Sequence, residues 1–389
     1  MGTDDTILDV DRLMKEASAT TGLDDYGTAP FLEPMSRFLE AAVREAQLTS
    51  EGLAGLRMDA DRWLVNRLRL QNDLTEHPEI LDEYVDDPVV IVGVPRTGTT
   101  KLQRMLACDP GMQSLPFWKI LNPVPFPDAR PGEPDPRLLI ARQFVEIMQL
   151  HHPDLLALHP FVPEEPEEEV VMLEMSCRSL SACLFFDVPT FFSWLTAQPQ
   201  VPLYEELRVL LQYQQWQDGG RRDRPWVLKS PMHLGRIDAL LEVFPNATIV
   251  HCHRDLHTSM TSICNLVEAS RAIRSDRSDP IALGRFLLKF LSDEWSANLR
   301  QRTSLPADAQ VLDVRFDRIR DDAPEVLRGI YRSRGAALSE PAESAMRGWA
   351  KVNHGRSGAY RRPAEYYGLE ASAVEAAFSS YLDALPDLR

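Results

Sequence analysis

Three basic residues each stand at the end of a short apolar run of the kind that forms a buried strand. They are Arg96, Lys229 and Arg254. In an open sheet of parallel strands, ligands bind just beyond the carboxyl ends of the strands. We therefore expect these three side chains to converge on one anionic group and to stabilise negative charge that develops there.

The loop around Arg96 has the spacing of a phosphate-binding loop with one position changed. Gly93 and Gly98 match the two glycines of G-x-x-x-x-G-K-[ST], but Thr99 occupies the lysine position. Because that lysine contacts the β- and γ-phosphates, its absence argues against a nucleoside triphosphate and favours a single 5′-phosphate-like group. The helical pattern that follows would add free backbone N–H groups and the positive end of a helix dipole. A purely structural strand-to-helix turn is the alternative. The residues expected to bind the anion here are Pro95, Arg96, Thr97, Gly98, Thr99 and Thr100.

The composition limits the classes of function. The chain has 389 residues, is 44% hydrophobic and carries a net charge of −16, so it can bury a large core but does not favour nucleic acid or an anionic membrane as a partner. Its five cysteines have no metal-like spacing and fit reduced thiols. We see no basic leader and no apolar run long enough to span a bilayer. We therefore expect a cytoplasmic protein without an integral membrane span.

Alternating apolar runs and helical patterns predict an α/β fold. Strands are expected at 89–92, 226–228, 248–252 and 311–314, each followed by a helical pattern. Such units form a parallel sheet with right-handed crossovers. We predict a P-loop-like three-layer α/β architecture with a mainly parallel sheet. Helical stripes over 1–87 predict an N-terminal helical cap, which is also a candidate for a homodimer contact.

The rest of the chain, 88–389, is expected to form one α/β domain with a helical insertion around 137–218. The proline-rich segment 116–136 cannot form a continuous helix or a central strand. Apolar periodicity predicts further continuous helices over 170–184 and 371–385.

Three motifs resemble those of the sulfotransferases that use 3′-phosphoadenosine 5′-phosphosulfate (PAPS). They are PRTGTT (Pro95–Thr100), LKSP (Leu228–Pro231) and FPNATIVHCHRDLHTSMTS (Phe244–Ser262). The similarity is greater to the bacterial and tyrosylprotein-type branch than to the cytosolic phenol and steroid branch. It covers about 170 residues, and the first 85 residues add little to it. The resemblance implies that 88–389 is a sulfotransferase-type domain and that the insertion around 137–218 forms the acceptor site.

The resemblance also implies roles in binding PAPS. Pro95–Thr100 would hold the 5′-phosphosulfate, and Arg254 with Ser262 would hold the 3′-phosphate. Their eight-residue spacing lets an arginine at a strand end and a serine two helical turns further on contact one phosphate. Arg356 lies in a basic, glycine-bearing segment that is expected to close on the anion.

The catalytic groups are less clearly marked by the sequence. Arg96 is expected to contact the transferred group, and Lys229 matches a lysine of the tyrosylprotein-type branch that would stabilise charge on the leaving oxygen. An acceptor hydroxyl also needs a base. Relatives commonly have a glutamate where this chain has Lys119. Within the acidic stretch 158–169 we choose Glu168 first and His159 second, and a solvated acidic loop is the alternative.

The resemblance predicts the transfer of a sulfuryl group from PAPS, without a metal, to a hydroxyl of a small or lipid-like acceptor. The apolar stretch 184–195 would line the acceptor pocket, or it belongs to the core. His251, His253 and His257 suggest a metal site, but the third lies on a following helix and packed histidines are the simpler interpretation. The alternatives are a P-loop kinase or other ATP-binding protein, and a nucleotide-sensing protein with a degenerate site.

Overall fold

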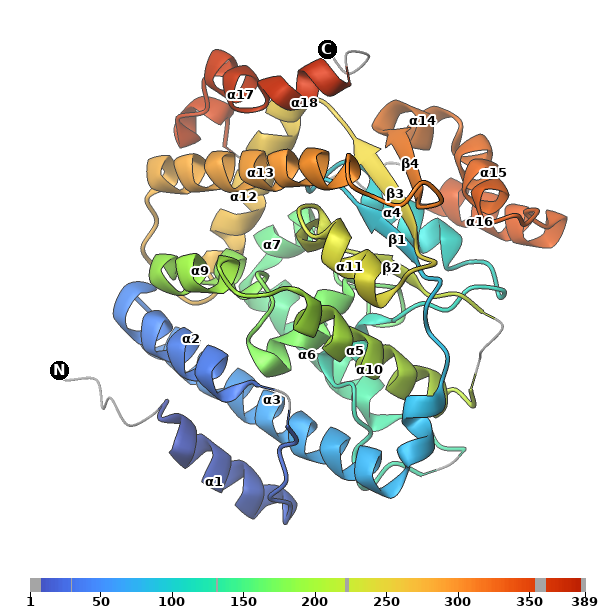
Figure 1. Ribbon diagram of the computed structural model, residues 1–389. Coiled ribbons are helices and arrows are strands. Elements are labelled where there is room, and N and C mark those ends of the chain that lie inside the picture. The colour runs from blue at the N-terminus through green and yellow to red at the C-terminus, as the bar shows by residue number, and fades with distance from the viewer. Residues whose placement is uncertain (1–7, 29, 131, 221–223, 354–361, 386–389) are drawn as a thin grey trace.

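A parallel sheet lies at the centre of the fold. The computed structural model describes residues 8–28, 30–130, 132–220, 224–353 and 362–385. Within these residues, four strands form one sheet in the order β2-β1-β3-β4, seen at the upper right of Figure 1. The strands are β1 (Val89–Val92), β2 (Val227–Lys229), β3 (Thr248–His253) and β4 (Gln310–Arg315). Every pairing is parallel, which confirms the predicted strands and sheet.

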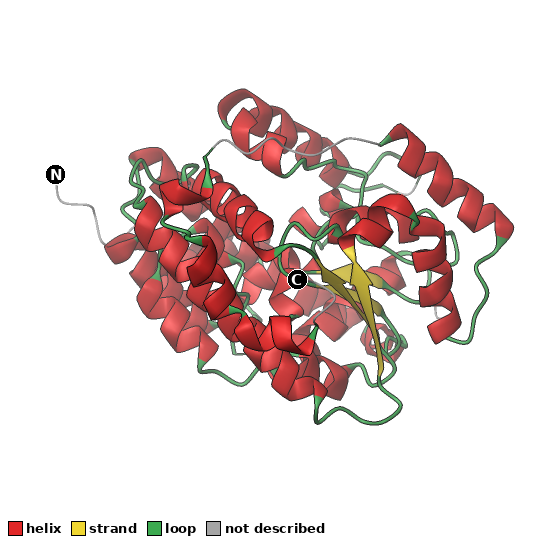
Figure 2. Cartoon of the chain, turned by 90° about the horizontal axis from the view of Figure 1, so that it is seen from above, coloured by secondary structure: helices red, strands yellow, loops and turns green. Residues whose placement is uncertain are grey.

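The sheet is covered on both faces because alternate residues of its strands enter two different hydrophobic cores. The first and third residues of β1 pack with α4 (Thr99–Leu106), α15 (Ala323–Ser333) and α16 (Glu340–Val352). The second and fourth residues belong to the larger core, to which α12 (Leu256–Arg271) and α13 (Pro280–Arg302) contribute. Figure 2 shows the sheet between the two sets of helices. The predicted three-layer α/β architecture is therefore confirmed.

The N-terminal part is helical, as predicted. It contains α1 (Val10–Thr21), α2 (Leu32–Glu45) and α3 (Ser50–Glu76), with a short 3₁₀ helix, η1 (Pro78–Asp82), before β1. The side chains of Asp9 and Thr49 cap the first turns of α1 and α3. The buried residues of these helices lie in the same core as β1. A domain boundary at residue 87 and a homodimer contact through this segment stay predictions.

Beyond α4, further helices of 4 to 17 residues lie between β1 and β2. They are α5 (Phe117–Leu121), α6 (Pro136–His151), α7 (Pro153–Leu158), α8 (Ala182–Phe185), α9 (Pro189–Thr196) and α10 (Val201–Gln217). The expectation of one continuous helix over 170–184 is wrong. The chain instead forms a 3₁₀ helix, η2 (Glu169–Ser176), and then turns at Cys177, which has a φ of 51°. A residue in the left-handed region ends a helix, and apolar periodicity alone does not report it.

The part of the chain that follows β2 surrounds β3 and β4. Besides the helices already given, it contains η3 (Pro231–His233), α11 (Ile237–Val243), α14 (Phe316–Asp321), η4 (Ala364–Tyr367), α17 (Ala371–Ala377) and α18 (Ser379–Ala384). The predicted continuous helix over 371–385 is wrong, because the chain breaks between α17 and α18 at Phe378, whose side chain is buried in the larger core.

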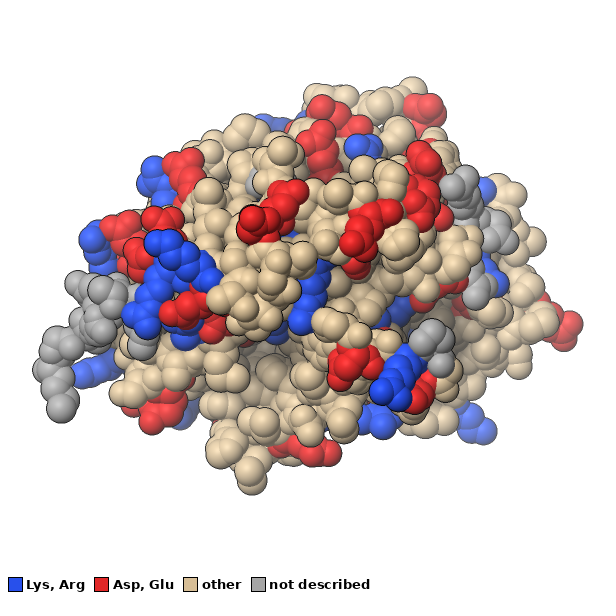
Figure 3. Space-filling model, turned by 90° about the horizontal axis from the view of Figure 1, so that it is seen from below, with Lys and Arg blue, Asp and Glu red and all other residues tan. Residues whose placement is uncertain are grey.

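Among the described residues, none of the helices combines the length and the hydropathy that crossing a membrane requires. The face shown in Figure 3 interleaves basic with acidic side chains, in keeping with a chain whose net charge is −16. An anionic ligand therefore depends on a local basic site.

Candidate active site

The backbone conformation of the loop between β1 and α4 depends on two glycines with positive φ angles. Gly93 and Gly98 have φ values of 149° and 90°. A Cβ atom on Gly93 would lie 2.5 Å from the carbonyl oxygen of Cys252, and one on Gly98 would lie 3.0 Å from the ring of Phe316. Arg96 also has a positive φ, of 75°. The loop therefore passes very close to the end of β3, as a phosphate-binding loop requires.

The same loop offers donors that fit an anion. α4 begins at Thr99, and its N-cap, Gly98, supplies no side-chain hydrogen bond, so the first amides of the helix are available. The Thr97 hydroxyl is buried and has no hydrogen-bond partner among the described residues. A buried hydroxyl without a partner costs free energy unless a ligand satisfies it. These features fit a phosphate or sulfate group seated on the loop.

Arg96, Ser262 and Arg254, which are far apart in the sequence, are linked in the structure. Arg96 Nε donates to Ser262 Oγ at 3.0 Å, and its Nη1 donates to the carbonyl oxygen of Leu158 at 2.9 Å. Arg254 Nη1 donates to the carbonyl oxygen of Arg96 at 2.8 Å, and its guanidinium lies 4.2 Å from the ring centroid of Phe316. The structure thus brings Arg96, Ser262 and Arg254 together, and their role in binding an anion stays a prediction.

Lys229 ends β2, the strand paired with β1, and its side chain is only 1% exposed. Its Nζ lies 2.6 Å from Glu168 Oε1 and 3.5 Å from Glu167 Oε1. Burial by itself lowers the pKa of Lys229, but the charges of the neighbouring glutamates outweigh burial and raise that pKa above its ordinary value. The contacts of Lys229 with these glutamates therefore favour its charged form.

Three consecutive glutamates make three different sets of contacts. Glu167 is 2% exposed, and its carboxylate accepts a hydrogen bond from the Glu168 amide and lies 3.0 Å from His159 Nε2. Burial would raise the pKa of Glu167, but the charges of His159 and Lys229 hold it below its ordinary value. Glu169 accepts a hydrogen bond from the Lys229 amide at 2.9 Å. A solvated acidic loop is therefore the wrong interpretation for Glu167 and Glu169.

Glu168 is the most exposed of the three glutamates. Its side chain is 21% exposed, and its Oε2 accepts from Ser230 Oγ at 3.2 Å. Glu168 and His159 both line a cavity of about 100 Å³, which we call the inner cavity, together with Pro95 of the phosphate loop, and Glu167 lines the same cavity. Both residues chosen from the sequence as base candidates are thus brought to the same cavity.

The inner cavity is otherwise mostly apolar. Its apolar lining includes Leu155, Val171, Leu184, Phe185, Ile263 and Leu266. The stretch 184–195 therefore contributes two residues to this wall, whereas Phe191 and Leu195 are buried in the core. Lys119 is not among the residues that line this cavity. Its Nζ pairs with Asp218 at 2.5 Å, so Lys119 does not replace, as a base, the glutamate that relatives commonly have at this position.

The two strand histidines lie next to Asp313 of β4. His253 Nε2 is 2.8 Å from Asp313 Oδ1, and one ligand atom from each of His251, His253 and Asp313 lies within 4.8 Å of the others. However, Arg302 donates to both oxygens of Asp313, at 2.8 and 2.6 Å. A guanidinium that occupies the carboxylate disfavours a cation at the same place.

Arg356, also expected at the site, lies outside the described residues.

Several residues of the site escaped sequence reasoning. Arg104 of α4 pairs with Glu165 at 2.7 Å and approaches Glu167 at 4.0 Å. His233 lies 2.5 Å from Glu169 Oε1 and 3.0 Å from the hydroxyl of Tyr204. The only signal for His233 is its place four residues after Lys229. Each of these side chains holds a glutamate of the site in position.

Comparisons with known proteins agree with this geometry. The model of the family described as "Sulfotransferase family" matches residues 88–340. The omega-hydroxy-beta-dihydromenaquinone-9 sulfotransferases of Mycobacterium bovis and Mycobacterium tuberculosis are each 30% identical over 188 residues, which are 47% of this chain and 46% of theirs. The match thus spans about half the length of these curated relatives.

Two solved structures are similar over nearly the whole chain. The sulfotransferase STF9 of Mycobacterium avium is 26% identical, with a TM-score of 0.87, and the match covers 99% of this chain and 98% of that one. The sulfotransferase STF1 of Mycobacterium tuberculosis is 29% identical, with a TM-score of 0.80, over 97% of this chain and 100% of that one. Placement in the tyrosylprotein-type branch stays a prediction. The chain belongs to the sulfotransferase family.

Proposed function

We propose that this protein is a sulfotransferase that moves a sulfuryl group from PAPS to the hydroxyl of a lipid-like acceptor. One observation carries the proposal: the phosphate loop and the base candidate Glu168 meet at a single apolar cavity, which Pro95 and Glu168 both line. Lys229 is hydrogen-bonded to Glu168 at this junction. An anion site, a positive charge, a base and an apolar pocket are therefore contiguous.

The donor-binding roles follow from the contacts at the loop. We assign the 5′-phosphosulfate to Arg96, the hydroxyls of Thr97, Thr99 and Thr100 and the first amides of α4. The unpartnered Thr97 hydroxyl and the two glycines of the loop support this assignment. We assign the 3′-phosphate to Arg254 and Ser262, which the Arg96 side chain and backbone connect. Family membership supports a sulfuryl donor of this kind.

In the proposed reaction the acceptor oxygen forms a bond to sulfur while the bond between sulfur and the bridging phosphate oxygen breaks. The electron pair of that bond stays on the phosphate oxygen, where the positive charge of Lys229 would stabilise it. The hydroxyl proton passes to the carboxylate of Glu168, since a base must stand within hydrogen-bond reach of the acceptor. Glu167, which also lines the inner cavity, and Glu169 contact Lys229 and hold it in position.

The acceptor is assigned from the lining of the inner cavity. Apolar side chains surround the point where the hydroxyl would meet Glu168, which favours an acceptor with a hydrocarbon body. The curated relatives carry the name of a sulfotransferase for a hydroxylated menaquinone derivative, which supports a lipid-like acceptor here as well. We also propose that the reaction needs no metal, so that a chelator leaves its rate unchanged.

The test is release of adenosine 3′,5′-bisphosphate from PAPS in the presence of a panel of primary alcohols, with and without a chelator. We expect alcohol-dependent release in both cases, and tight binding of the bisphosphate by calorimetry. An Arg318→Met protein serves as a control, because Arg318 is exposed and pairs with Asp322 on the surface. Tight bisphosphate binding without turnover of any alcohol would indicate a nucleotide sensor. Magnesium-dependent ATP binding with no affinity for the bisphosphate would indicate a P-loop kinase.

A further inference from the structure

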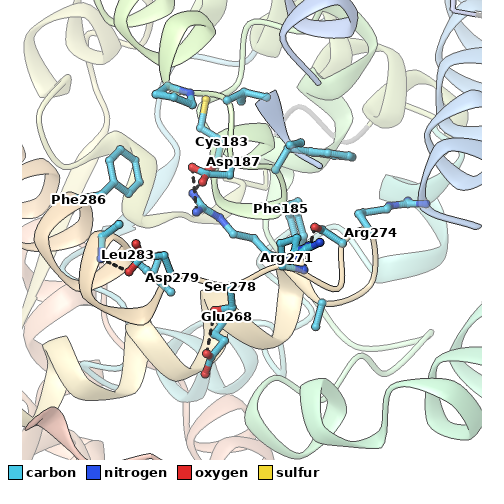
Figure 4. Close-up of a pocket in the computed structure, with 18 of the residues that line it drawn as sticks. Cys183, Phe185, Asp187, Glu268, Arg271, Arg274, Ser278, Asp279, Leu283 and Phe286 are labelled. Atoms are coloured by element: carbon cyan, nitrogen blue, oxygen red, sulfur yellow. Dashed lines mark hydrogen bonds and ion pairs between the residues drawn. The ribbon is translucent and has the colours of Figure 1, made fainter. Parts of the chain in front are cut away.

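A second cavity, of about 510 Å³, lies next to the inner cavity, and we call it the outer cavity. Figure 4 shows it between the end of α12 and the segment that contains Phe185 and Asp187. Phe185 lines both cavities. We propose that the acceptor is an elongated, uncharged molecule whose hydroxyl lies in the inner cavity and whose far end passes Phe185 into the outer cavity. This inference rests on the proposed sulfotransferase function.

α12 forms a continuous wall from the donor site to the outer cavity. Ser262 contacts Arg96 at the phosphate loop. Ile263 and Val267, which follow on neighbouring turns, line the inner cavity, and Arg271 lines the outer one. With a rise of about 1.5 Å per residue, the distance along the helix from Ile263 to Arg271 is about 12 Å. A single extended chain can therefore run along one helix from the reacting group into the outer cavity.

The sizes of the two cavities indicate which part of such an acceptor each cavity would hold. The inner cavity, at about 100 Å³, is about one fifth as large as the outer one, at about 510 Å³. Ligand sites usually enclose most of their ligand within several hundred cubic ångströms. The inner cavity alone is too small for that, so it suits the hydroxyl end of an acceptor. Most of the apolar body would lie in the outer cavity.

The lining of the outer cavity indicates an uncharged occupant. Four phenylalanines contribute apolar surface: Phe185, Phe186, Phe192 and Phe286. The charged groups are four carboxylates (Asp187, Glu268, Asp276 and Asp279) and three guanidinium groups (Arg271, Arg274 and Arg277), so the formal sum is −1. The guanidinium of Arg271 already pairs with the Asp187 carboxylate at 3.0 Å, as Figure 4 shows. An anionic far end would meet a slightly negative wall, whereas a neutral hydrocarbon would contact the aromatic rings.

The test fills the outer cavity without touching the donor site. Ala282 is exposed, lies in the first turn of α13 and lines the outer cavity, so Ala282→Trp places an indole there. Ala272→Trp, at the exposed end of α12, fills the same cavity from another element. Ala373→Trp is the matched control, because Ala373 is also exposed but lines neither cavity. Turnover of 1-butanol, 1-dodecanol and 12-hydroxydodecanoate with PAPS is measured for each protein.

We expect the unsubstituted protein to use 1-dodecanol with a higher kcat/KM than 1-butanol or 12-hydroxydodecanoate. Ala282→Trp and Ala272→Trp should lower kcat/KM for 1-dodecanol by about tenfold more than for 1-butanol, a difference of about 1.4 kcal/mol. Ala373→Trp should change neither. Equal effects of the cavity-filling variants on the two alcohols, or preferred use of the hydroxy acid, would overturn this inference while turnover still supported the sulfotransferase. No turnover of any alcohol by the unsubstituted protein would overturn the proposed function itself.

Discussion

Replacing Glu168 by glutamine would remove the proposed base while keeping the shape of the side chain. The glutamine oxygen can still accept from Lys229, now at 2.6 Å, and its amide can still lie beside Ser230, now at 3.2 Å. The loss is one charge-assisted hydrogen bond at a side chain that is 21% exposed. Such a loss costs about 1 kcal/mol of folding free energy. We therefore expect Glu168→Gln to fold and to melt within a few degrees of the unsubstituted protein.

The effect of Glu168→Gln on the reaction should be much larger. Loss of a general base lowers kcat by about 10²- to 10⁴-fold, which corresponds to about 2.7–5.4 kcal/mol of activation free energy. The affinity for adenosine 3′,5′-bisphosphate should change by no more than about twofold, because Glu168 does not belong to the phosphate loop.

The assay is bisphosphate release at saturating PAPS, with melting curves and calorimetry on the same samples. Glu164→Gln is the matched control, since Glu164 lies in the same acidic stretch but is exposed and pairs with Arg142. A loss in kcat below about threefold would refute the assignment and leave His159 as the base. Unfolding or loss of bisphosphate binding would instead show that Glu168 holds the site together.

Three further predictions follow from the contacts of the site and the core. Arg254→Met should weaken bisphosphate binding by at least about tenfold in calorimetry and leave kcat at saturating PAPS within about threefold. The exposed control Arg318→Met should change neither the affinity nor kcat. A large loss of kcat with unchanged bisphosphate affinity would instead place Arg254 at the transferred group. Lys229→Met should lower kcat by at least about 100-fold and also reduce stability, because it removes the ammonium group that pairs with Glu167 and Glu168. Since the folded pKa of Lys229 is raised, the stability difference should persist up to the ordinary pKa of 10.5 and disappear only above it. A difference that disappears below pH 9, or an equal loss in the exposed control Lys289→Met, would contradict this. Burial raises the pKa of Glu174 to about 7, so the stability that its neutral form contributes is lost as pH rises through that value. In denaturant unfolding, Glu174→Gln should therefore stabilise the protein at pH 8 by up to about 3 kcal/mol more than at pH 5. Equal effects of the substitution at the two pH values would contradict this cause.

Some features of this protein could be predicted from short stretches of sequence because their causes are local. Four apolar residues in a row are enough to mark β1 as a buried strand, and glycines at the two positive-φ positions of the next loop mark the anion site. The strand-end positions of Arg96, Lys229 and Arg254 follow from the same pattern, since parallel strands end at one edge. Local periodicity failed at Cys177 and Phe378, where a turn set by packing interrupts an apolar pattern.

Other features depend on contacts between residues that are distant in the chain, and only the tertiary structure decided them. Consecutive glutamates look equivalent in the sequence, yet Glu167 and Glu169 are buried against partners, while Glu168 is partly exposed where it lines the inner cavity. Lys229, which separates these roles, is 61 residues away from Glu168, and the pair of Arg96 and Ser262 spans 166 residues. The sequence by itself determined the strands, the anion loop and the charges at the strand ends, because backbone conformation and apolar patterning act over a few residues. The tertiary structure decided which carboxylates are buried and which residues line the two cavities, because burial and cavities arise only when distant segments pack together.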